Sequence, residues 1–209
     1  MTDAASRFPN VCARLRRTHT APGIQPSETT LTIWLWNTAF RVRDEAGRPY
    51  SDVVNDVRSA RGFGATPRTM EEFMDTSYRS RHSTDRDPTE LYGDFQTGEA
   101  TVREAGQDPW PVSPEVIAPV AAQLLTDGRE AELELVSTTT YLDRPCAEYR
   151  FTLTGDEDGV PYRSDVRRLV SGPFVLLQEV RDERISQLAT VTEVVELNEG
   201  TVTDADLRP

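Results

Sequence analysis

The chain has 209 residues, of which 37% are hydrophobic and 28% are charged, a composition typical of a folded globular protein. Its formal net charge is −12, and the acidic excess is concentrated in residues 106–209, which contain 20 acidic residues and 9 arginines. Because a nucleic-acid-binding surface requires a basic face, we expect no nucleic-acid partner.

Several functional classes lack their usual sequence signals. No segment reaches the roughly 18 apolar residues of a membrane span, and the first residues lack the apolar core of a secretory signal. We therefore expect a cytoplasmic protein with no integral membrane association. Cys12 and Cys146 form no CxxC pair, and His19 and His82 are the only histidines. This leaves little material for a metal site or a Ser–His–Asp triad, so we expect no catalytic residue, metal or cofactor.

The N-terminal segment predicts a short helix at residues 7–19. Val11 and Leu15 contribute to an apolar stripe, and arginines crowd the C-terminal end, where cations suit the helix dipole. Prolines and a glycine in residues 22–26 then break the chain. Residues 1–27 are thus expected to form an N-terminal helix and a linker.

The next segment predicts a β-hairpin with a turn at residues 37–38. The first strand alternates with a period of two and places three aliphatic side chains on one face: Leu31, Ile33 and Leu35. Trp34 and Trp36 lie on the opposite face, which predicts that both faces of this strand are at least partly covered. Phe40 belongs to the returning strand.

Helical periodicity appears in three segments of the middle of the chain: residues 51–57, 69–78 and 114–126. The third is the clearest, because Ser113 suits the N-cap and Pro114 the first helical position. Its apolar stripe includes Ile117 and Leu124. The remaining segments predict loops at residues 58–67 and 79–90 and a short strand or hairpin at residues 91–103.

From residue 131 onward, the pattern predicts at least four antiparallel strands joined by tight turns. Tyr149 and Phe151 share a face of one of them, and residues 155–159 predict an acidic turn. The acidic excess is expected on turns and solvent-facing positions of this sheet. The pattern as a whole predicts an α+β fold, in which the helices cover one face of a long antiparallel sheet.

Three segments resemble the lipoprotein-carrier superfamily of LolA/LolB/RseB-like half-barrel proteins: TLTIWLWNTAFRVRDEAGR (30–48), TYLDRPCAEYRFTL (140–153) and SGPFVLLQEVRDERISQLATVTEVVELNEGTVTDADL (171–207). Asn37 and Thr38 replace the proline of the family's first hairpin, and Asp143 stands where glycine is common.

The resemblance implies a single LolA-like domain over residues 1–209. Its fold would be a curved antiparallel sheet, an incomplete β-barrel, with helices covering the concave face. Residues 28–200 would form the half-barrel core and residues 201–209 a tail. In the family, the apolar interior holds acyl chains or lipid. Because the family carriers are exported and this chain shows no leader, their transport role is not carried over.

We expect a non-enzymatic binding protein whose apolar cleft takes a lipid-like ligand or an acylated or hydrophobic partner. Eight residues are expected to line the cleft: Leu31, Ile33, Leu35, Phe40, Ile117, Leu124, Tyr149 and Phe151. One alternative is a protein-interaction or regulatory module with a filled core, which binds through its acidic C-terminal half, including residues 156–158. Another is an enzyme with an atypical carboxylate pair such as Glu179 and Glu193. The oligomeric state is left open.

Overall fold

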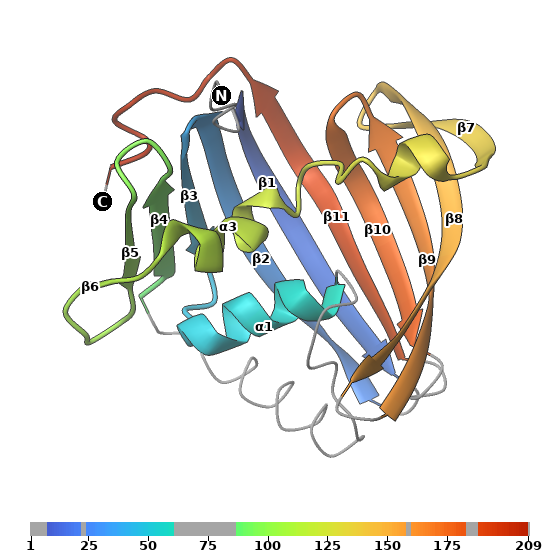
Figure 1. Ribbon diagram of the computed structural model, residues 1–209, viewed down its shortest axis with the longest axis horizontal. Coiled ribbons are helices and arrows are strands. Elements are labelled where there is room, and N and C mark those ends of the chain that lie inside the picture. The colour runs from blue at the N-terminus through green and yellow to red at the C-terminus, as the bar shows by residue number, and fades with distance from the viewer. Residues whose placement is uncertain (1–7, 22–23, 61–86, 158–159, 183–187, 209) are drawn as a thin grey trace.

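The computed structural model describes residues 8–21, 24–60, 87–157, 160–182 and 188–208. These residues form one large antiparallel sheet of 11 strands, in the order β6-β5-β4-β3-β2-β1-β11-β10-β9-β8-β7 (Figure 1). Since β6 and β7 are its two edges, the described sheet is open, as the sequence predicted.

The strands have the following bounds: β1 (Phe8–Ala21), β2 (Ile24–Asn37), β3 (Ala39–Asp44), β4 (Thr89–Asp94), β5 (Glu99–Arg103), β6 (Trp110–Pro111), β7 (Leu135–Tyr141), β8 (Arg144–Glu157), β9 (Val160–Ser171), β10 (Phe174–Asp182) and β11 (Leu188–Glu199). The described part also contains the helices α1 (Tyr50–Ala60) and α3 (Pro114–Ala122) and the 3₁₀ helix η1 (Arg129–Glu132). No helix in these ranges is long and apolar enough to cross a membrane.

The structure corrects the prediction for the N-terminus, because residues 7–19 do not form a helix. Phe8–Ala21 is a strand at the centre of the sheet, paired with β2 on one side and β11 on the other. Val11, Ala13 and Leu15 are buried and the residues between them are more exposed, which is the period of a strand. The helical interpretation was wrong. It arose because Val11 and Leu15 are four residues apart, a spacing that fits one face of a helix as well as one face of a strand.

The predicted hairpin of β2 and β3 is confirmed. Leu31, Ile33 and Leu35 are buried, whereas Trp34 and Trp36 on the other face are half-buried. Both faces of this strand are thus covered at least in part, as predicted.

Residues of the C-terminal tail help to cover the face of the sheet that carries Trp34 and Trp36. The Arg41 guanidinium lies 5.0 Å from the centre of the Trp34 ring and donates a hydrogen bond to the carbonyl oxygen of Asp206 at 3.0 Å. Val202 and Leu207 are buried as well, so the tail packs against the rest of the protein.

The helical predictions have different outcomes. The helix predicted at residues 51–57 is confirmed as part of α1, which extends over three residues of the predicted loop at 58–67. The rest of that loop and the helix predicted at residues 69–78 lie outside the described residues. So do residues 79–86 of the second predicted loop, which ends in β4. The strand or hairpin predicted at residues 91–103 is confirmed as the hairpin of β4 and β5.

The C-terminal strands β7 to β11 confirm the prediction of at least four antiparallel strands. Residues 142 and 143 adopt positive φ angles in the tight turn between β7 and β8. The acidic turn predicted at residues 155–159 is corrected in part, because residues 155–157 belong to β8. Residues 158–159 lie outside the described ranges.

The helix α3 ends at Ala122, four residues before the end of the helix predicted at residues 114–126. Residues 123–126 leave the helix and supply backbone hydrogen bonds to β10. The amide of Val175 donates to the Leu124 carbonyl and the amide of Thr126 to the Pro173 carbonyl, both at 2.9 Å. Leu125 also forms an isolated bridge with Phe174. The chain after α3 is therefore attached to the beginning of β10. We call residues 123–132, including η1, the crossing segment.

Candidate ligand-binding site

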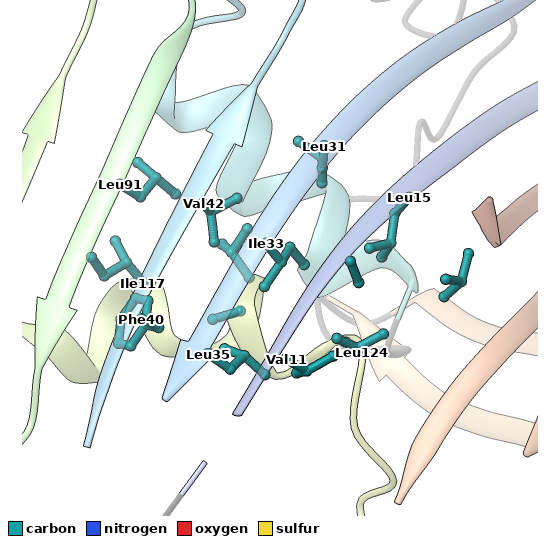
Figure 2. Packing of buried hydrophobic residues seen from close by; sticks show 14 of the residues in the cluster. Val11, Leu15, Leu31, Ile33, Leu35, Phe40, Val42, Leu91, Ile117 and Leu124 are labelled. Atoms are coloured by element: carbon teal, nitrogen blue, oxygen red, sulfur yellow. The ribbon is translucent and has the colours of Figure 1, made fainter. Parts of the chain in front are cut away.

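Six of the eight predicted cleft residues lie together in a filled core: Leu31, Ile33, Leu35, Phe40, Ile117 and Leu124 (Figure 2). Each is at most 2% exposed. They come from β2, β3, α3 and the residues after α3, and α3 packs against β2, β3 and β4. We call the face of the sheet that carries these residues the inner face. On this half of the sheet, the inner-face side chains pack against one another.

A row of polar side chains crosses the inner face and marks the border of this core. Register pairing aligns one residue from each of five successive strands, β9, β10, β11, β1 and β2: Arg168, Gln178, Thr192, Arg17 and Thr29. We call these five residues the polar row. Arg17 is 2% exposed and Arg168 is 5% exposed, so two guanidinium groups lie inside the protein. Buried charges require specific partners, because their transfer out of water is costly.

Each buried arginine bonds both to the polar row and to the crossing segment. Arg168 Nε donates to Gln178 Oε1 at 2.8 Å, and its NH1 donates to Glu130 Oε1 at 2.5 Å. Arg17 Nε donates to Thr192 Oγ1 at 3.0 Å, and its NH2 donates to Gln123 Oε1 at 2.6 Å. The arginines therefore attach the crossing segment to the sheet on both sides of the β10–β11 boundary.

A small cavity lies between these groups. It has a volume of about 20 Å³, and its lining includes Arg17, Gln123, Asp127, Arg168 and Gln178. This is room for about one water molecule. This cavity is too small for an organic ligand. Any larger occupant requires movement of the crossing segment.

The other two predicted cleft residues, Tyr149 and Phe151, lie on β8 and are only half-buried. In the sheet register, Tyr149 is opposite Arg168 and Phe151 is opposite Val166, so both share the inner face. Val166 is in turn opposite Val180 on β10. We call five inner-face residues of β8, β9 and β10 the apolar patch, of which Val166 is buried and the other four are half-buried: Tyr149, Phe151, Leu153, Val166 and Val180.

The carboxylates proposed as a catalytic pair have separate arginine partners. Glu179 bonds to Arg181 at 2.6 Å and Glu193 to Arg16 at 2.7 Å. Such pairing is typical of structural ion pairs on a sheet surface. Across the described ranges, no group of three or more His, Cys, Asp or Glu side chains could hold a metal ion.

Cys12 and Cys146 are free thiols, and the second is buried. Burial raises the pKa of both thiols, so they are protonated at neutral pH. A protonated thiol is a weak nucleophile.

Sequence reasoning missed the polar row. Arg17 stands at the next inward position after Val11, Ala13 and Leu15, so its alternation predicts burial once residues 8–21 are read as a strand. Arg168 likewise stands between Val166 and Val170 in an alternating strand. Both signals were present, although arginine is rarely buried and is normally assigned to the surface.

No protein-family model matches the sequence, and a search of curated proteins finds no match. Solved structures do show similarity. An uncharacterized conserved protein from Thermus thermophilus is 12% identical, with a TM-score of 0.47 over 98% of this chain and 86% of that chain. A LolA superfamily protein from Nitrosomonas europaea is 11% identical, with a TM-score of 0.37 over 97% and 92% of the two chains.

MucB, solved in complex with MucA, is 14% identical with a TM-score of 0.41. The alignment covers 98% of this chain and 56% of MucB. The predicted resemblance to LolA- and RseB-like proteins is confirmed as a distant one. At these identities and TM-scores the similarity carries no argument about function, which must be argued from the site.

Proposed function

We propose that this protein binds the hydrocarbon part of a lipid-like molecule on the apolar patch. The observation that carries the proposal is the contrast between two parts of the inner face. The β2–β4 part is packed against α3, whereas Tyr149, Phe151 and Leu153 on β8 remain half-buried. Half-buried aromatic side chains retain apolar area that a ligand can still remove from water.

The proposal includes two expectations from the sequence, the half-barrel architecture and the cytoplasmic localisation. The curved sheet would be an incomplete barrel with helices over its concave face, and the protein would act in the cytoplasm. The six buried residues then serve as the support of the site, and the apolar patch serves as its lining. Each 100 Å² of apolar area that a ligand and the patch bury contributes roughly 2.5 kcal/mol before the costs of association.

A matched pair of variants on β8 tests the proposal. Leu153→Glu places a carboxylate in the apolar patch, and Thr154→Glu places it on the opposite, exposed face, where Arg163 is the register partner. We expect Leu153→Glu to weaken dodecanol binding at least about tenfold, because the alkyl chain would then desolvate a charge. Thr154→Glu is expected to change it less than about twofold, both measured by displacement of a fluorescent fatty acid.

Two results would contradict the proposal: no measurable dodecanol binding by the wild-type protein, or equal weakening by both variants. Circular dichroism spectra of both variants establish that the fold is retained. Native mass spectrometry of the purified protein provides an independent readout, since a co-purified lipid would appear as added mass.

A second candidate function is protein binding along β7. This strand is an edge of the described sheet, six of its seven residues are exposed, and its sequence LVSTTTY contains no charge or proline. Natural proteins usually protect such edges, because they pair readily with another extended chain. The exposed Glu132 and Glu134 just before the strand favour a basic partner segment.

An alternating Arg-Val peptide is the probe for this second function. We expect it to bind in low salt and to lose affinity when Thr138 is replaced by proline, which removes a backbone donor on the strand. Thr203→Val, on the exposed C-terminal tail, is the control for a lost threonine. Peptide binding that Thr138→Pro leaves unchanged would exclude β7 as the docking edge.

A further inference from the structure

Arg168 is a buried cation that stands at the border between the polar row and the apolar patch. It is opposite Tyr149 in the register, and its guanidinium carbon lies 5.3 Å from the centre of the Phe151 ring. The arginine thus contacts the proposed hydrocarbon site directly. A charged donor at the end of an apolar surface is the arrangement that orients an amphiphile.

The anion that Arg168 now holds belongs to the protein itself. Glu130 of the crossing segment provides a carboxylate at 2.5 Å, and Asp127 provides a more distant one at 3.4 Å. Both acids come from the same short stretch after α3. The ion pair therefore keeps this stretch over the end of the apolar patch that is nearest to Arg168.

The match between Arg168 and Glu130 is incomplete. The hydrogen bond joins only one nitrogen of the guanidinium to Oε1 of Glu130. Oε2 of the same carboxylate is buried and has no hydrogen-bond partner among the described residues. An arginine binds a carboxylate or phosphate best through two parallel hydrogen bonds. A free anion that pairs with two nitrogens of Arg168 would therefore be held better than Glu130 is.

We propose that Arg168 binds the anionic head group of the ligand, a carboxylate or a phosphate, which takes the place of Glu130. This inference rests on the proposed function and names its ligand class: a single-chain anionic amphiphile. Its hydrocarbon chain lies along Phe151 and Leu153, and its head group lies at the polar row. Glu130 moves into water, so the number of charges paired inside the protein is unchanged.

The exchange also couples binding to the crossing segment. When Glu130 is displaced, the segment keeps its backbone hydrogen bonds to β10 at Leu124 and Thr126 but loses its attachment through η1. The small cavity beside Arg17 and Arg168 can then enlarge. The net charge of −12 does not prevent anion binding, because charges beyond about 8 Å are screened at physiological ionic strength.

Three probes of equal chain length test the inference: dodecanoate, dodecyl phosphate and dodecanol. We expect the wild-type protein to bind at least one of the two anions about tenfold more tightly than dodecanol, and the comparison of the anions identifies the head group. Arg168→Gln is expected to abolish this preference and to leave dodecanol binding in place. The control is Arg181→Gln on the same sheet, whose side chain is 72% exposed and paired with Glu179.

Glu130→Gln provides a second test that leaves every arginine in place. Since the competing carboxylate is removed, we expect anion affinity to rise about fivefold and dodecanol affinity to stay the same. Equal binding of all three probes by the wild-type protein would overturn the head-group inference but support the hydrocarbon site. An unchanged or lower anion affinity in Glu130→Gln would also overturn it. Failure of all three probes to bind would overturn the proposed function as well.

Discussion

Replacement of Phe40 by alanine is expected to lower the free energy of unfolding by about 3–5 kcal/mol, the usual cost of removing a fully buried aromatic ring. Phe40 is 0% exposed, and its ring centre lies 5.9 Å from that of Phe8 and 6.1 Å from that of Phe95. Gly93 is its partner on β4, and a Cβ at that position would overlap the ring. The strand thus lacks a side chain where the ring needs the space, and urea unfolding at neutral pH measures the loss.

The same variant separates the core from the binding surface. If Phe40 supports the sheet but does not touch ligand, Phe40→Ala retains dodecanol affinity at temperatures where it is folded. Phe40→Leu is the milder control, with an expected loss of about 1–2 kcal/mol because most of the volume is kept. A stable Phe40→Ala protein with weakened dodecanol binding would instead indicate that Phe40 contacts the ligand.

Alternation with a period of two predicts which side chains of this sequence share a face of the sheet, but it does not predict how deeply they are buried. A period of two placed Leu31, Ile33 and Leu35 on one face of a strand, and the structure confirms that face. Alternation does not say what covers a face, because the cover comes from distant parts of the chain. The same alternation holds for Tyr149 and Phe151, yet these two residues are half-buried and the other three are fully buried.

The N-terminal strand was missed for a different physical reason. Its apolar residues Val11 and Leu15 satisfy both a helical and an extended spacing, and the arginines at positions 14, 16 and 17 favoured a helix end. In the structure, long-range pairing with β2 and β11 decides the conformation. Local propensity is a weak guide wherever pairing of this kind is available.

The acidic C-terminal half was expected to be a solvated surface, and the structure corrects this for two of its acids. Glu130 and Glu148 are at most 9% exposed and are held by arginines. Because every basic residue in the chain is arginine, each cation offers several donors in a planar fork. Glu130 in η1 and Glu148 on β8 can therefore be buried, because each faces an arginine of β9.

Glu148 should make a measurable contribution to stability that depends on pH. The hydrogen bonds donated by Arg167 and Arg150 lower the pKa of this carboxyl to about 2, from an ordinary value of 4.5. A depressed pKa in the folded state stabilises the protein above about pH 4.5, and this stabilisation is lost as the pH falls through about 2. Linkage sets an upper limit of roughly 3 kcal/mol, and the solvent exposure of Arg150 and Arg167 reduces the expected value to about 2 kcal/mol.

We therefore expect Glu148→Gln to lower the free energy of unfolding by about 2 kcal/mol at pH 7. The difference from the wild-type protein should shrink as the pH falls below 4.5 and approach zero below about pH 2, because the wild-type carboxyl is then protonated in the folded state as well. Glu199→Gln is the matched control, since Glu199 is half-exposed and pairs with Arg144 alone among the ion pairs of the described residues; its expected effect is below about 0.5 kcal/mol. A difference between wild type and Glu148→Gln that stays constant from pH 7 to pH 2 would assign the role of Glu148 to packing rather than to charge.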